Sequence, residues 1–140
     1  MTRRTFSGTK VVQNLAEQRN ATIAVANANQ VKYADLNIAS ENYVNAIGKA
    51  AAIKYNLADG DNTHLNEWGG VVFSRIVSDI IVERYPEFEP FVKKNATLSA
   101  LIKAEKRLKK VAHWLIDAIT TETEQTLKRF VTALHHFHFP

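Results

Sequence analysis

Apolar residues recur at helical spacing over most of the chain, which predicts helices as its main elements. The first helix is expected from residue 10 to about Ala28, with Thr9 as its N-cap. The second is expected to follow Ser40, another capping residue, and to cover Glu41 to about Tyr55. Residues 1–9 are polar and contain a Ser-Gly turn signal, so we expect a loop there.

A third helix is predicted to begin at Gly69 or Gly70, where a broad apolar stripe starts. It should end near Arg84, because Pro86 cannot continue a helix. Between the first two helices, Val31–Asn37 alternates in polarity and is rich in strand formers, which predicts the one strand of the chain. This order of elements is typical of a doubly wound α/β protein with a parallel sheet. One strand cannot form a sheet, so the pattern indicates the last part of such a domain.

The C-terminal part of the chain has a different pattern. From Thr97 onward, apolar residues recur at helical spacing for about six turns, and a second apolar stretch follows Thr120-Thr121. We expect an αα-hairpin or one long interrupted helix. Within it, the segment Lys103–Lys110 carries five basic residues and one acidic residue, Glu105. Such a cluster is most often a solvated helix face.

Composition and charge narrow the class of protein. The 140 residues suit one ordinary domain, and 46% hydrophobic and 23% charged residues are globular values. The formal charge of +4 comes from the local Lys103–Lys110 cluster, so no nucleic-acid partner is expected. No apolar run reaches the length of a membrane span, and no apolar core follows the charged N-terminus as in a signal peptide. Without cysteine, disulfides and thiolate metal sites are excluded, and no cofactor is expected.

The candidate chemistry lies in the polar loop from Leu57 to about Asn66. It contains Asp61 and His64, the only histidine before residue 113. A carboxylate and an imidazole three positions apart can meet on one turn, which suits an aspartate that orients a histidine acting as base. An ordinary capped loop with a solvated histidine is an open alternative. A calcium loop is excluded, because His64 occupies the position that requires glycine.

The segment Asp61–Asn66 (Asp-Asn-Thr-His-Leu-Asn) resembles the Asp-x-x-His block of the SGNH (GDSL-type) esterases, and most of all the rhamnogalacturonan acetylesterase group. Tyr33–Asn37 resembles the strand that precedes this block, and Thr2–Phe6 resembles a loop after an earlier strand. The resemblance covers about residues 2–102. It implies that residues 1–102 are the C-terminal portion of a three-layer α/β/α, flavodoxin-like domain, mostly helical here, and that residues 103–140 are a helical extension.

The resemblance implies that His64 and Asp61 are catalytic. His64 would take the proton of a serine hydroxyl as it attacks an acetyl carbonyl, and Asp61 would hold the imidazole in the right tautomer. The implied substrate is an acetylated pectic polysaccharide such as rhamnogalacturonan, and the complete family proteins are extracellular. The chain has no Gly-Asp-Ser block for the nucleophile and lacks the family's oxyanion blocks. We therefore expect a truncated esterase that is inactive alone.

Other features leave alternatives open. Trp68, close to His64 in sequence, either lines a sugar site or packs under the third helix. His135, His136 and His138 suggest a metal site, but without a nearby carboxylate a C-terminal tail is favoured. The alternative for the whole chain is a non-catalytic helical interaction protein whose basic amphipathic tail contacts a partner. The pattern predicts no oligomeric state.

Overall fold

The computed structural model describes residues 1–105, which are mostly helical with two short strands. The strands β1 and β2, the α-helices α1 to α4 and the 3₁₀-helices η1 and η2 have these bounds: β1 Phe6–Ser7, β2 Lys10–Val11, α1 Ala16–Ala28, α2 Leu36–Ile47, α3 Lys49–Ala52, η1 Ile53–Tyr55, α4 Glu67–Arg84 and η2 Pro86–Phe91. Residues 96–105 are also helical. Among these residues, no helix has the length and apolar character that a bilayer span needs.

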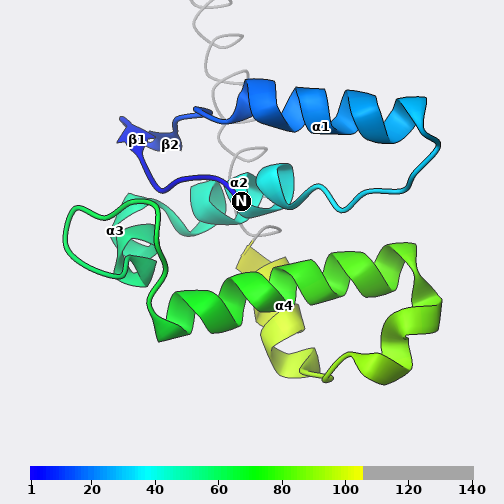
Figure 1. The fold of residues 1–140 in the computed structure, drawn as a ribbon. Coiled ribbons are helices and arrows are strands. Elements are labelled where there is room, and N and C mark those ends of the chain that lie inside the picture. Colours follow the sequence, from blue (N-terminus) through cyan, green and yellow to red (C-terminus); the bar gives the residue numbers. More distant parts are fainter. Residues whose placement is uncertain (106–140) are drawn as a thin grey trace, which may run out of the picture. The chain divides into compact units, whose positions relative to one another are not determined.

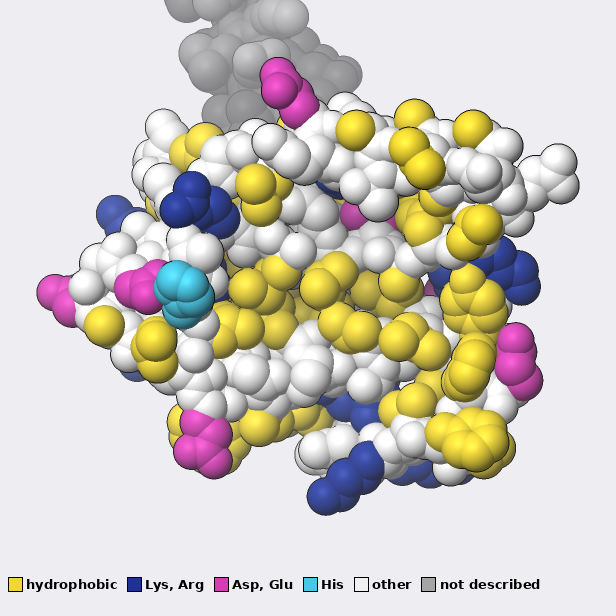
Figure 2. Space-filling model, in the orientation of Figure 1, with side chains coloured by type: hydrophobic (Ala, Val, Ile, Leu, Met, Phe, Trp, Pro, Cys, Tyr) yellow, Lys and Arg dark blue, Asp and Glu magenta, His cyan; other side chains and the backbone are white. Residues whose placement is uncertain are grey.

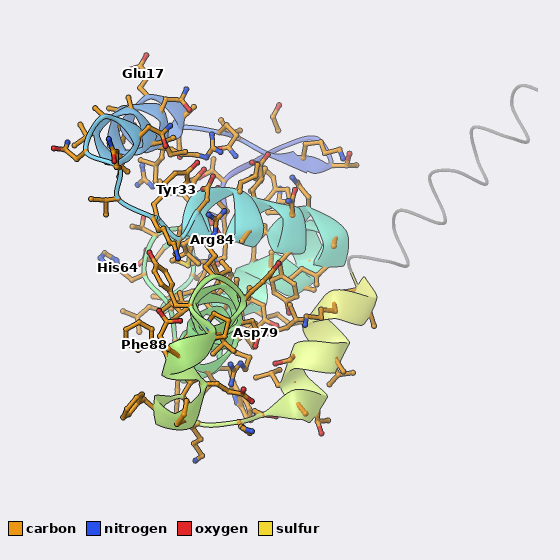
Figure 3. The ribbon with its side chains drawn as sticks, turned by 90° about the vertical axis from the view of Figure 1, so that its right-hand side faces the viewer. Glu17, Tyr33, His64, Asp79, Arg84 and Phe88 are labelled. Atoms are coloured by element: carbon orange, nitrogen blue, oxygen red, sulfur yellow. The ribbon has the colours of Figure 1, made fainter. Side chains whose placement is uncertain are left out.

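The helices lie in layers, with α2 between α1 and α4 (Figures 1 and 3). The core forms where α2, α4 and the helical residues 96–105 meet, and its buried members are Val11, Tyr43, Val44, Ala52, Val72, Phe73, Ile76 and Ile102. The ring of Phe73 meets those of Tyr43 and Tyr55 edge-on, with centroids 6.0 and 5.8 Å apart. This packing joins α4 to α2 and to η1, directly before the candidate loop.

The predicted third helix is confirmed as α4, which starts slightly before Gly69. The Asn66 side chain caps it by accepting a hydrogen bond from the Gly69 N–H at 2.9 Å. The helix ends at Arg84, before Pro86, as the sequence predicted.

The predicted strand Val31–Asn37 is wrong. Residues 31–35 have no regular structure, and α2 begins at Leu36. The reason is Asp35, whose carboxylate caps α2 by accepting from the Ile38 N–H at 3.1 Å. The same carboxylate binds the guanidinium of Arg19 on α1 at 2.5–3.0 Å. These two roles of Asp35 make the segment the entry to a helix and not a strand.

The first two helices also differ from the prediction. The first begins at Ala16, because Lys10–Val11 pairs antiparallel with Phe6–Ser7 around Gly8, which has a φ of 58°. Ser40 does not cap the second helix, since its hydroxyl is buried inside α2 and accepts from the Thr2 N–H at 2.8 Å. That helix ends at Ile47 instead of Tyr55, because Gly48 takes a φ of 80°. The described strands form an antiparallel hairpin, and the three layers implied by the resemblance stay a prediction.

Large apolar side chains remain exposed on this part of the protein. The 13-residue helix α1 has no buried residue, and Val25 on it is 63% exposed. Figure 2 shows an apolar band that crosses the molecule between α1 and α4, with a cyan histidine near one end of it; among residues 1–105 the one histidine is His64. Such a continuous apolar surface is unusual for a chain that has no partner. Most of the basic cluster and the C-terminal histidines lie outside the described residues.

Candidate functional site

The candidate loop is closed at its base by backbone hydrogen bonds. Asn56 and Leu65 form an antiparallel bridge, and the Leu57 N–H donates to the His64 carbonyl at 3.1 Å. Next to this bridge, the Asn66 N–H donates to the Tyr55 carbonyl at 3.0 Å. Since Tyr55 packs on Phe73 and Asn66 caps α4, the loop is attached to the core on both sides.

Asp61 and His64 contact each other as the sequence predicted. The distance between Asp61 Oδ2 and His64 Nδ1 is 2.9 Å. Asp61 Oδ1 accepts from the backbone N–H groups of Thr63 and His64 at 3.0 and 2.9 Å. Three donors therefore hold the carboxylate in one orientation, and one of them is the imidazole.

These hydrogen bonds keep Asp61 ionised. They lower the pKa of its carboxyl group to about 2, and the largest contribution comes from the His64 backbone N–H, followed by that of Thr63 and then by the imidazole. Because an ionised carboxylate can only accept, Nδ1 carries the hydrogen in this contact, and the neutral form of the ring then has its lone pair on Nε2.

The reactive edge of His64 is open to solvent. The imidazole side chain is 71% exposed, and the described residues make no hydrogen bond to Nε2. Figure 3 shows it projecting from the body of the protein on the side where Tyr33 and Phe88 also project. An oriented imidazole with a free Nε2 can take a proton from a hydroxyl group that approaches from this side.

Trp68 does not pack under α4, because its side chain is 74% exposed. The predicted packing of Trp68 under the third helix is therefore wrong, and its predicted role in lining a sugar site stays a prediction. A polar pocket of about 400 Å³ lies beside the loop, lined by Ile53, Asn56, Leu57, Ala58, Asp59, Gly60 and Asn62.

No serine of residues 1–105 is hydrogen-bonded to His64. The hydroxyls of Ser74 and Ser78 donate to backbone carbonyls of α4 at 3.0 and 2.9 Å. Ser40 is buried, and the Ser99 hydroxyl donates to the Asp79 carboxylate at 2.9 Å. Within these residues the imidazole therefore has an orienting acid but no serine hydroxyl hydrogen-bonded to it.

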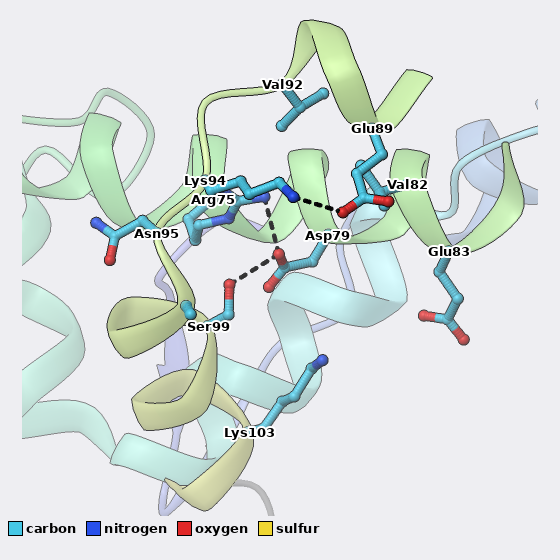
Figure 4. A pocket seen from close by; sticks show the side chains of 11 residues that line it. Arg75, Asp79, Val82, Glu83, Glu89, Val92, Lys94, Asn95, Ser99 and Lys103 are labelled. Carbon is cyan, nitrogen blue, oxygen red and sulfur yellow. Dashed lines mark hydrogen bonds and ion pairs between the residues drawn. The ribbon is translucent and has the colours of Figure 1, made fainter. Parts of the chain in front are cut away.

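Ser99 belongs to a separate polar cluster on the C-terminal half of α4 (Figure 4). There the guanidinium of Arg75 pairs with Asp79 at 2.9 Å and donates to the Lys93 carbonyl at 2.7 Å. These bonds surround a pocket of about 330 Å³ and attach residues 96–105 to α4. We interpret the cluster as structural, because each acid in it has a close cationic or hydroxyl partner within the fold or faces solvent.

Two residues that the sequence did not single out hold the candidate loop from outside. The backbone N–H of Arg4 donates to the Asn62 carbonyl at 2.9 Å, and its side chain enters the base of the loop. Arg3 Nε donates to the Thr63 hydroxyl at 3.0 Å. Both arginines lie about sixty residues before the loop, so no local pattern connects them with it.

Comparisons with models of known protein families, with curated proteins and with solved structures found no match for this chain. Residues 1–105 also contain no group of three His, Cys, Asp or Glu side chains that could hold a metal ion.

Proposed function

We propose that Asp61 and His64 are the acid–base half of a serine esterase site of the SGNH type. The observation that carries this proposal is the 2.9 Å contact between Asp61 Oδ2 and His64 Nδ1, together with an exposed Nε2. The resemblance of the motif to rhamnogalacturonan acetylesterases supports an acetylated pectic polysaccharide as substrate and an extracellular place of action.

The chemistry follows from the two ring nitrogens. Nε2 of His64 takes the proton of a serine hydroxyl while its oxygen attacks the acetyl carbonyl. When the tetrahedral intermediate collapses, the sugar C–O–acyl bond breaks at the acyl carbon, and Nε2–H gives the proton to the departing sugar oxygen. Water then hydrolyses the acetyl-serine by the same two steps. Asp61 stays ionised and stabilises the imidazolium that forms in each step.

The serine in this scheme comes from another polypeptide segment. No described serine is hydrogen-bonded to His64, and residues 106–140 contain neither serine nor cysteine. The apolar band beside His64 supports this arrangement, because a segment that packs on it would bring its own side chains to the imidazole (Figure 2).

The test is complementation. The purified chain is mixed with a fragment of a rhamnogalacturonan acetylesterase that carries the Gly-Asp-Ser block but lacks the Asp-x-x-His segment. Acetate release is measured from acetylated rhamnogalacturonan and from an aryl acetate. We expect no turnover by the chain alone above that of His64→Ala. The mixture should turn over both substrates and should lose this activity with His64→Ala.

Two results contradict the proposal in different ways. Turnover by the isolated chain that requires His64 would mean that the chain holds its own nucleophile. A mixture that associates by gel filtration but releases acetate equally well with His64→Ala would mean that His64 is not the base.

The second candidate is a non-catalytic interaction protein, and the exposed apolar side chains favour it. Trp68, Val25 and Phe91 are 74%, 63% and 83% exposed, and Figure 2 shows a contiguous apolar band, which is the kind of surface that marks an interaction site. This candidate predicts tight association with a partner, and the affinity should not change when Asp61 and His64 are substituted. Binding measured with the double variant Asp61→Asn, His64→Ala separates the two candidates.

A further inference from the structure

Arg4 is the one cation that is fully buried in residues 1–105. Its side chain is 1% exposed, and the described residues place no carboxylate within ion-pair distance of it. Burial lowers the pKa of this guanidinium, and the nearby Asp61 carboxylate opposes that effect. A buried cation without a paired carboxylate costs stability, so its position needs a reason beyond folding.

The hydrogen bonds that Arg4 donates go to the candidate loop and to Asn56, directly before it. Nε donates to Asn56 Oδ1 at 2.6 Å, and Nη2 donates to the His64 carbonyl at 2.6 Å. Asn56 extends this hydrogen-bond network into the loop, because its Nδ2 donates to Asn62 Oδ1 at 3.1 Å. The guanidinium thus joins Asn56, the residue directly before the loop, to the residue that carries the imidazole, while Nη1 is buried without a partner.

From this arrangement we infer that Arg4 is a positioning residue, whose planar guanidinium sets the backbone at His64 so that Nδ1 meets Asp61. The role of Arg4 in catalysis depends on the function proposed above, whereas its effect on the imidazole does not. Two donors at fixed separation are needed to reach Asn56 and His64 together, and a lysine ammonium, a point charge, cannot reproduce them.

The charges that face the loop are those of Asp61, in contact with His64, of Arg4 beneath it, and of Arg3, bound to Thr63. Arg3 offers the matched control. It precedes Arg4 directly, it has the same charge, and it also donates to the loop, but it is exposed and reaches only a side-chain hydroxyl. Arg3→Gln therefore removes an equal charge without touching the backbone at His64.

The experiment measures the tautomer of His64 by ¹⁵N NMR of the imidazole in the full chain. The native protein and Arg3→Gln are expected to show the Nδ1–H form. Arg4→Gln and Arg4→Lys are expected to lose it, although Arg4→Lys keeps the charge. In the complementation assay, both Arg4 variants should lower kcat by about 10²-fold with little change in KM, the size expected for a misplaced base.

Three outcomes overturn the inference. These are an Arg4→Lys variant with the native tautomer, an Arg3→Gln variant with the same loss as Arg4→Gln, and Arg4 variants that change KM alone. If Arg4→Gln does not fold, Asn56→Ala carries the test, because it removes one acceptor of the guanidinium and should also reduce the Nδ1–H form. A tautomer change without any activity in the mixture would refute the proposed function and leave the positioning role intact.

Discussion

Two neighbouring glycines in the first turn of α4 allow a test of how the candidate loop is attached to the core. A Cβ atom at Gly69 would lie 2.8 Å from Leu65 Cδ2 and 2.9 Å from the Tyr55 carbonyl oxygen. That oxygen is fixed, because it accepts the Asn66 N–H at the end of the loop. At Gly70, nothing lies within 4 Å of the added atom. Ala substitutions at the two positions differ only in what the methyl group meets.

The magnitudes follow from two opposing effects. Replacing glycine by alanine inside a helix raises the free energy of unfolding by about 0.5–1 kcal/mol. Forcing a methyl group into a packed site lowers it by about 1–3 kcal/mol. Gly70→Ala has only the stabilising effect of alanine in a helix, whereas Gly69→Ala has both this effect and the steric cost. The difference between the variants isolates the steric cost, so Gly69→Ala should be less stable than Gly70→Ala by about 1–3 kcal/mol.

The assay is urea denaturation of the native chain and of both variants, followed by circular dichroism. With an unchanged m-value, the midpoint of Gly70→Ala should rise and that of Gly69→Ala should fall below it. Equal midpoints for the two variants would refute the close approach of α4 to Tyr55 and Leu65. The loop would then not be attached to the core in the way described.

Three further changes test other contacts. Asp61 has a folded pKa of about 2 against an ordinary value of 3.8, so it contributes stability above pH 4 that is lost as the pH falls toward 2. Asp61→Asn should therefore show a smaller drop in the free energy of unfolding over that range in acid titrations of stability. Phe73→Ala should lower the free energy of unfolding in urea by about 3–5 kcal/mol, because Phe73 is 3% exposed. A decrease of less than 1 kcal/mol would contradict the burial of Phe73 in the core. Ser99→Ala should cost about 1 kcal/mol by removing the bond to Asp79, and an unchanged midpoint would mean that this bond adds nothing.

The features predicted correctly from the sequence depend on local bonds. The contact between Asp61 and His64 follows from a spacing of three residues on one turn, and it needs no knowledge of the rest of the fold. The end of α4 follows from Pro86 in the same way.

The features that the sequence did not predict depend on distant partners or on competing local bonds. The alternating polarity of Val31–Asn37 predicted a strand, but Asp35 serves as a helix cap and as the partner of Arg19. Serine is a common helix cap, yet the hydroxyl of Ser40 accepts a hydrogen bond from the Thr2 N–H, thirty-eight residues away. Arg4 reaches the loop across sixty residues. The polar character of a residue in the sequence does not show whether it caps a helix, pairs with a distant residue or is buried in a hydrogen-bond network.

The most direct test of the central claim is the tautomer of His64 in the native chain and in Asp61→Asn, measured by ¹⁵N NMR at a pH where the ring is neutral. If Asp61 orients the imidazole as a base, the native chain carries the proton on Nδ1, and Asp61→Asn shifts it toward Nε2. A native chain with the proton on Nε2, or a tautomer that does not respond to Asp61→Asn, would contradict the claim that these two residues form half of a hydrolytic site.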